Sequence, residues 1–498
     1  MKNFVMGIVL AMAAAASGCG AVYRLAADSA ANLQRVTAFP TVSVPPSAKP
    51  KALPQLPRNK PLPHLEQWIY AFDSKGRRYL KKSKNFKDFL KRTGTTAFIV
   101  CKNDTIVHES YAGKGNRRHA PQIYSTTKSV VSALVGIALE EGAFTGLDQK
   151  ASDFFPEFAR DERRHITLGH LIHMQSGLNH EDWKYISKVV RLYYNDSPDG
   201  LIRRSKPMYP AGTHFAYKSL DTQILGMCLE RATGKPIEKY FYEKLWNPMG
   251  AESGAKWLYS KKRGGSAKMY GGMCATARDL VRFGQMYLHY GAVDSQQVVP
   301  RKWAEVPAYP DTTDGKFWAY SYGWWRFMMM RDFSLAPTPF FATGLGWQRI
   351  YVDRETNTVI VRLGKKRGHV EWTHACRVLS RYPKEPLIYE TAPRNAMPLV
   401  GRYRALDGRT ALVAYSQGIL SVKAFGKKMS FLPETDLAFS APEHRAKALF
   451  VRENGKIAAL QVDLWNQSAY FYKVVSPKNR TPQDLRKEPG AVAFQRGE

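Results

Sequence analysis

One stretch constrains the fold of this chain more than any other: a short extended run, ending near Tyr124, leads directly into a helix-forming segment. Beyond Lys128, apolar residues recur at helical spacing as far as Gly142, namely Val130, Val131, Leu134, Val135, Ile137, Ala138 and Leu139. Because this pattern leaves little polar surface, it predicts a largely buried helix with Ser125 near its amino end.

Ser125 and Lys128 form an S-x-x-K motif at the start of this helix. Side chains three residues apart share a helix face, roughly 5 to 6 Å apart at Cβ, so the amine can reach the serine oxygen directly or through one water. The first amides of a helix have no partner within it and carry its positive dipole end. The motif therefore indicates a nucleophile, a base and an oxyanion-stabilising helix end. By itself it is also typical of a solvated helix surface.

The beginning of the chain indicates export. Residues 1–18 contain Lys2 and an apolar run over 4–16, which is typical of a signal peptide and too short to span a bilayer. Small residues before Cys19 are similar to a bacterial lipoprotein signal, in which that cysteine is lipidated. The alternative is an ordinary cleaved signal with a chance cysteine.

Cysteine and histidine spacing predicts no metal or cofactor. The five cysteines form no C-x-x-C pair and no Cys/His metal spacing. The four beyond Cys19 lie in apolar segments, which indicates buried thiols. His170 and His173 form an H-x-x-H, but zinc needs a third ligand and none is evident nearby, so packing is the favoured interpretation.

The chain is strongly basic, with 74 Lys and Arg against 42 Asp and Glu and a formal charge of +32. Such a charge attracts anionic surfaces, including phospholipid head groups, envelope polymers and nucleic acid. A basic proteome would explain it equally well. The densest basic run, 75–92, is interrupted by apolar residues as in an exposed amphipathic helix. It carries no nucleic-acid motif, so nucleic acid is not an expected partner.

A length of 498 residues predicts more than one domain. Residues 19–64 are rich in proline, alanine and serine and indicate an extended tether. The main domain is predicted over 65–383, a small antiparallel β domain over 396–478 and a flexible tail over 479–498. The β domain is indicated by short alternating segments at 410–415, 419–425, 448–452, 457–464 and 469–474.

Two further stretches of the main domain place polar residues beside predicted elements. Residues 210–221, which include Tyr217 and Ser219, precede a predicted helix over 222–233. The triplet 342–344, Ala-Thr-Gly, leads into predicted strands over 349–353 and 358–363. Other predicted elements are a β-hairpin over 96–111, a short helix over 166–178, a helix capped by Thr276 and a helix over 372–381.

With these three stretches in this order, residues 65–382 resemble the serine β-lactamase and penicillin-recognising superfamily. The resemblance is to the class C-like branch, which includes D-alanyl-D-alanine peptidases, esterases and 6-aminohexanoate-dimer hydrolase. It implies an α+β fold in which an antiparallel sheet is flanked by helices and joined to a helical subdomain. The carboxy-terminal strands are similar to the lipocalin-like or barrel-like appendage of some members.

The resemblance also implies roles for individual residues. Ser125 would be the acylated nucleophile and Lys128 its paired base, and Tyr217-Lys218-Ser219 matches the family's Tyr-x-Ser motif. The oxyanion hole would use the backbone amides of Ser125 and Leu345. Whether Lys128 or Tyr217 accepts the serine proton stays open. Substrate contacts are expected from Ser219, Thr343, Gly344, Trp183 and Trp347, the two tryptophans being equally interpretable as core residues.

Departures from the family pattern indicate the substrate. Ala342 stands where the family places a lysine or histidine, so no cation is presented to a substrate carboxylate, and Ser219 replaces the usual asparagine. We therefore expect a lipid-anchored periplasmic serine hydrolase acting on a small ester or amide. The alternatives are a D-amino-acid peptidase or weak β-lactamase, and a catalytically silent relative that binds anionic envelope polymers.

Overall fold

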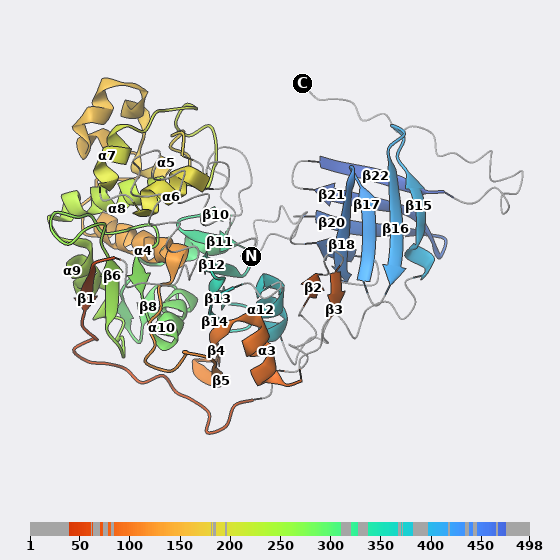
Figure 1. The fold of residues 1–498 in the computed structure, drawn as a ribbon, viewed down its shortest axis with the longest axis horizontal. Coiled ribbons are helices and arrows are strands. Elements are labelled where there is room, and N and C mark those ends of the chain that lie inside the picture. The colour runs from red at the N-terminus through yellow and green to blue at the C-terminus, as the bar shows by residue number, and fades with distance from the viewer. Residues whose placement is uncertain are drawn as a thin grey trace, which may run out of the picture. The chain divides into compact units, whose positions relative to one another are not determined.

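The protein is described by a computed structural model, in which the chain divides after Arg381 into two compact units (Figure 1). The predicted signal segment, Cys19 and Trp183 lie outside the described residues. These are 39–60, 62, 70–72, 78–80, 84–180, 182, 186–194, 197–309, 320–326, 337–366, 370, 372–381, 397–416, 419–433, 438–441, 446–464 and 467–474.

The larger unit is built on an antiparallel seven-stranded sheet. Its strands in spatial order are β10 (Tyr320–Ser321), β11 (Trp324–Arg326), β12 (Phe340–Gly344), β13 (Gln348–Asp353), β14 (Thr358–Gly364), β4 (Thr95–Lys102) and β5 (Thr105–Tyr111). The predicted hairpin over 96–111 is confirmed as β4 paired with β5. β13 and β14 are buried along their whole length, so helices must cover both faces of the sheet.

Helices occupy both faces of this sheet (Figure 1). On one face lies α10 (Ala277–Leu288), where Gly284 allows close approach because a Cβ there would lie 2.5 Å from Val359. On the other lie α3 (Phe86–Thr93) and α12 (Trp372–Arg381), and the Trp372 ring contacts Phe98. The predicted helix over 75–92 is confirmed only from Phe86 onward, where α3 begins after its cap, Asn85. It is wrong for 78–80, which form strand β3 paired with β2 (Tyr70–Phe72).

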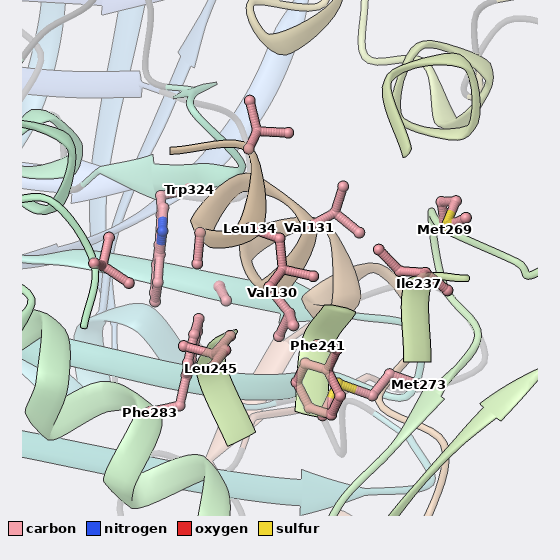
Figure 2. Close-up of a cluster of buried hydrophobic side chains, with 14 of the residues drawn as sticks. Val130, Val131, Leu134, Ile237, Phe241, Leu245, Met269, Met273, Phe283 and Trp324 are labelled. Carbon is pink, nitrogen blue, oxygen red and sulfur yellow. The ribbon is translucent and has the colours of Figure 1, made fainter. Parts of the chain in front are cut away.

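A helical region surrounds α4 (Thr127–Glu140), which follows the 3-10 turn η3 (Tyr124–Thr126). Every residue of α4 from Thr127 to Ala138 is buried, as predicted. Val130, Val131 and Leu134 lie among side chains from distant segments, including Phe241, Met273 and Trp324 (Figure 2). This packing fixes the first turn of α4, which carries Lys128 of the S-x-x-K motif.

The remaining helices of this unit are short, apart from α8. The predicted helix over 166–178 spans only α5, because Met174 takes a left-handed conformation with φ of +59° and ends it. Their bounds are α5 (Leu168–Ile172), α6 (Ile186–Tyr194), α7 (Pro198–Arg203), α8 (Ser219–Thr233), α9 (Ile237–Phe241), α11 (Arg301–Glu305), the 3-10 turns η4 (Ala151–Asp153), η5 (Pro156–Arg160), η6 (Glu162–His165) and η8 (Val306–Ala308), and the π-helical η7 (Tyr242–Trp246).

Part of the predicted tether belongs to the folded unit. β1 (Thr41–Val44) pairs with β6 (Ala255–Leu258), which in turn pairs with β7 (Met273–Cys274). Ser47 then donates to the backbone carbonyl of Asn247 at 2.9 Å. The alternating Thr-Val-Ser-Val sequence favours a strand, and the prolines that follow end it. A second small sheet joins β8 (Ala292–Val293) to β9 (Gln296–Gln297).

The second unit is a closed eight-stranded antiparallel barrel, confirming the predicted β-barrel-like fold. Five strands were predicted; the other three are β15, β18 and β19, whose short or lysine-rich sequences conceal the alternation. The strands are β15 (Gly401–Arg404), β16 (Thr410–Ser416), β17 (Ile419–Ala424), β18 (Lys427–Pro433), β19 (Ala438–Ala441), β20 (Ala446–Glu453), β21 (Lys456–Leu464) and β22 (Gln467–Lys473), preceded by η9 (Met397–Leu399).

The barrel has its own apolar core, in which Tyr403, Phe431, Phe450 and Phe471 are nearly inaccessible to solvent. The core of the larger unit is separate and centres on α4 and the sheet. Among the described residues, no helix is both long and apolar enough to cross a membrane.

Candidate active site

Ser125 lies in η3, at the junction between an extended segment and α4. The residue before it, Tyr124, has a φ of +49°, which is uncommon for a side chain of this size. Such strain persists only where surrounding structure imposes it, and it often accompanies functional sites. Ser125 itself is half-buried, just before the first residue of the buried helix.

Lys128 is held beside Ser125 by three hydrogen bonds. Its Nζ donates to the Ser125 hydroxyl at 3.1 Å, to the Ser219 hydroxyl at 3.1 Å and to the Tyr270 carbonyl at 3.0 Å. The side chain is only 2% exposed, and this burial lowers the pKa of Lys128 to about 8, with the Asp182 carboxylate opposing the shift. An amine with this pKa is partly neutral near physiological pH and can accept a proton.

Tyr217 completes the cluster from the segment that precedes α8. Its phenol is hydrogen-bonded to Ser125, and the Lys128 Nζ lies 5.0 Å from the centroid of its ring. The ring stacks on Trp325 with centroids 5.5 Å apart. Burial raises the pKa of Tyr217 well above its ordinary value, so the phenol is protonated at neutral pH. The structure thus brings Ser125, Lys128 and Tyr217 together.

Asp182 joins this cluster although the sequence did not single it out. It accepts from the Ser219 amide at 2.9 Å and from the Ser219 hydroxyl at 2.5 Å, while the same hydroxyl accepts from Lys128. Burial raises the pKa of Asp182, and the charge of Lys128 opposes that effect. Asp182 belongs to none of the sequence motifs, so only the folded chain reveals its proximity to Lys128.

The triplet 342–344 lies on β12 against η3. A Cβ at Gly344 would lie 2.2 Å from the Ile123 carbonyl and 3.2 Å from the Ser125 amide nitrogen, so only glycine fits. The strand therefore runs close to Ser125 and brings the turn at Leu345 beside it. Ala342 is buried in the core, whereas Thr343 and Gly344 are half-buried and Leu345 is 53% exposed.

Trp347 lies in the same turn, half-buried, two residues after Leu345. Its φ is +62°, and the Arg349 guanidinium lies 5.8 Å from the centroid of its ring. Its role as a substrate contact stays a prediction. Trp183, and with it Tyr185, lies outside the described residues.

The histidines and cysteines singled out in the sequence have structural surroundings. His170 accepts the Thr167 amide in a capping box at the start of α5, and the His173 ring contacts Tyr322 edge to face. The free cysteines of the described residues are all buried, as predicted: Cys101, Cys228, Cys274 and Cys376. Within the described residues, no group of three or more His, Cys, Asp or Glu is arranged to hold a metal.

Comparison with models of protein families identifies the family of this chain. Residues 83–374, more than half of the chain, match the family model described as Beta-lactamase. The chain belongs to the β-lactamase family. This confirms the resemblance inferred from Ser125, Tyr217 and the triplet 342–344.

Named relatives of this β-lactamase-family chain are hydrolases. The 6-aminohexanoate-dimer hydrolase of Paenarthrobacter ureafaciens is 25% identical over 304 residues, covering 55% of this chain and 73% of that protein. A protein of Escherichia coli K12 named "Putative D-alanyl-D-alanine carboxypeptidase" is 28% identical over 112 residues, covering 21% of this chain and 26% of that protein. The names of these relatives support a hydrolase activity for this chain.

A solved structure confirms the fold. The structure named "Putative 6-aminohexanoate-dimer hydrolase from Bacillus anthracis" superposes with a TM-score of 0.58 at 20% identity, covering 70% of this chain and 92% of that one. The predicted α+β, class C β-lactamase-like architecture is therefore confirmed.

Proposed function

We propose that this protein is a serine hydrolase that cleaves an ester or amide through an acyl-enzyme on Ser125. The observation that carries the proposal is the contact of the Lys128 amine with the Ser125 hydroxyl inside a buried cluster that also holds Tyr217. A nucleophile paired with a base that is itself oriented by further groups is the arrangement that activates serine. The hydrolase relatives support the reaction class.

In the proposed reaction, neutral Lys128 accepts the Ser125 proton as the serine oxygen attacks the substrate carbonyl carbon. The C–O or C–N bond to the leaving group then breaks, and the proton held by Lys128 passes to that group, with the Tyr217 phenol in position to relay it. Water next attacks the acyl carbon and loses a proton to Lys128. The bond between the acyl carbon and the Ser125 oxygen then breaks, the serine oxygen takes the proton back from Lys128, and the acid leaves. Lys128 suits the role of base, because its pKa of about 8 leaves roughly a tenth of the amine neutral at pH 7.

The tetrahedral intermediate formed in each half-reaction carries an oxyanion. We assign the backbone amides of Ser125 and Leu345 to it, since β12 delivers the Leu345 turn to the start of η3. Such preorganised donors are commonly the largest single contribution to catalysis of acyl transfer, and losing one costs about 100- to 1000-fold in kcat.

The surroundings of Ser125 favour an uncharged substrate. Ala342, on the strand that lines the site, is buried in the core and offers no cation to a carboxylate. Ser219 is occupied by Lys128 and Asp182, so it does not replace the amide that would hold a substrate carbonyl. A small ester or non-standard amide is therefore the proposed substrate. A D-amino-acid peptidase or weak β-lactamase is the second candidate, favoured by the carboxypeptidase-named relative.

Anchoring by lipid at Cys19, on the periplasmic side of a bacterial envelope, is a further part of the proposal. It is supported by the signal-like sequence of 1–18, and the charge of +32 supports attraction to anionic envelope polymers. Metabolic labelling with a palmitate analogue tests the anchor: we expect labelling of the full chain and none of the Cys19→Ala variant. Equal labelling of both proteins would remove the anchor from the account.

Replacement of the nucleophile tests the reaction. Ser125→Ala should abolish hydrolysis of p-nitrophenyl esters while the melting temperature stays within a few degrees of wild type. The matched control is Ser129→Ala, since Ser129 lies buried on the same helix but donates to the Gly323 carbonyl. This variant should retain activity. Hydrolysis that survives in Ser125→Ala would refute the proposal, and comparing esters with nitrocefin and D-alanyl peptides separates the candidate substrates.

A further inference from the structure

A buried guanidinium lies behind the turn that follows β12. Arg362, in the middle of β14, has no solvent-exposed surface. Its planar group has five N–H donors, and all five are used: Nε donates to the Thr95 hydroxyl at 3.0 Å, and the two terminal nitrogens donate to four backbone carbonyls. The five acceptors are neutral oxygen atoms, so the cation is held by the backbone rather than by an acid.

Two of these bonds reach the turn itself. Nη1 of Arg362 donates to the carbonyls of Gly346 and Trp347, both at 2.7 Å. The third carbonyl of the turn, that of Leu345, accepts a hydrogen bond from the side-chain Nε2 of Gln348 at 3.0 Å. All three carbonyls of the 345–347 turn are thus drawn toward buried donors. The peptide plane joins each of these carbonyls to the amide of the next residue, so the bonds fix the amides of Gly346, Trp347 and Gln348. The turn that begins at Leu345 is therefore held from its carboxy-terminal side.

The turn needs this support because its backbone is strained. Gly346 and Trp347 both have positive φ, +78° and +62°. The conformation is natural for glycine, whereas a bulky side chain such as that of Trp347 adopts it only when the surroundings impose it. Charge-assisted hydrogen bonds are roughly twice as strong as neutral ones, so the guanidinium can hold the strained conformation.

The sequence also reserves the space that the guanidinium occupies. A Cβ at Gly364 would lie 2.3 Å from Nη2 of Arg362, and a Cβ at Gly346 would lie 2.6 Å from the Gly364 carbonyl. The Trp372 ring covers the guanidinium at 4.3 Å. Burial lowers the pKa of Arg362 to about 9, so it is still charged at neutral pH.

We propose that Arg362 is a positioning residue for hydrolysis: it holds the 345–347 turn so that the Leu345 amide faces the oxyanion formed at Ser125. This inference rests on the proposed function, since it assigns the turn a catalytic purpose. Arg362 acts from the sheet face that α3 and α12 cover, without contact with substrate. A displacement of about 1 Å in such a donor can cost about 100-fold in rate.

The test compares Arg362→Met and Arg362→Lys with the matched control Arg354→Met. Arg354 also donates to backbone carbonyls, those of Tyr287 and Ala304, but at a distance from the turn. With a p-nitrophenyl ester, Arg362→Met should lower kcat about 100-fold and change KM less than threefold, and fluorophosphonate labelling should slow in parallel. Arg354→Met should keep kcat within about threefold of wild type, even where its melting temperature falls equally.

A second measurement isolates the strain and serves even if Arg362→Met does not fold. Trp347→Gly accepts positive φ without strain, so Arg362→Lys should cost at least fivefold less in kcat in that background than in wild type. Wild-type kcat in folded Arg362→Met, equal kcat losses in Arg362→Met and Arg354→Met, or identical losses from Arg362→Lys in both backgrounds would overturn the inference. Absence of labelling in wild type would instead overturn the proposed function.

Discussion

Asp182 should set the pH at which the base becomes active. It is linked to Lys128 through the Ser219 hydroxyl, with hydrogen bonds of 2.5 and 3.1 Å. The carboxylate stabilises the charged amine and so raises the pKa of Lys128 against the effect of burial. In Asp182→Asn that support is lost, and the pKa of Lys128 should fall below its value of about 8. Neutral amine then appears at lower pH.

The size of the shift follows from the geometry. Two unit charges about 5 Å apart interact by about 3 kcal/mol at an effective dielectric constant of about 20, which corresponds to about two pKa units. Asp182 is only half-buried, so solvent screens its charge and weakens the interaction. We therefore expect the pKa of Lys128 to fall by about one unit in Asp182→Asn.

The assay is kcat/KM for a p-nitrophenyl ester between pH 5 and 10, because its acidic limb reports ionisations of the free enzyme. Each profile is normalised to its own plateau, which separates the shift from any loss of rate. Asp221→Asn is the matched control: this carboxyl is fully buried beside Lys218 and Ser176, and burial raises its pKa to about 6. The acidic limb of the kcat/KM profile of Asp221→Asn should stay at nearly the same pH as that of wild type.

An acidic limb in Asp182→Asn that stays in place or moves to higher pH would refute the coupling. It would also remove the assignment of Lys128 as the base.

Two further substitutions test other parts of the site. Tyr217→Phe should lower kcat/KM about 100-fold or more, the usual scale for losing a proton-transfer group, without lowering the melting temperature by more than a few degrees; activity within threefold of wild type would remove Tyr217 from the mechanism. Gly344→Ala should both destabilise the fold by about 1 to 3 kcal/mol in urea denaturation and slow fluorophosphonate labelling, because its Cβ would lie 2.2 Å from the Ile123 carbonyl. Unchanged stability and labelling would show that β12 does not pack on η3 as described.

Local sequence predicted the elements whose pattern is self-contained. The apolar spacing after Lys128 is confirmed by the burial of α4, and the alternating hairpin over 96–111 is confirmed by β4 and β5. The predicted helix over 75–92 holds only for α3, because the apolar and basic residues of this run are divided between β3 and α3 and the sequence shows no clear break between the two elements. The pairing of β1 with β6 depends on a partner more than 200 residues away, which composition does not reveal.

The residues of the candidate site also fall into those that short motifs predict and those that only the structure shows. Ser125, Lys128 and Tyr217 were named because short motifs carry them, and the structure brings all three together. Asp182 and Arg362 stand in no motif. Asp182 matters because it contacts Ser219, and Arg362 matters because it contacts the 345–347 turn. Contacts of this kind are visible only once distant segments are folded against each other.

The most direct test of the central claim is the site and stoichiometry of labelling by a fluorophosphonate, measured by intact mass and peptide mapping. The account predicts one label per chain, carried by Ser125, and none in folded Ser125→Ala. Folded wild-type protein that takes no label, or takes it at another residue, would contradict the claim that Ser125 is an activated nucleophile.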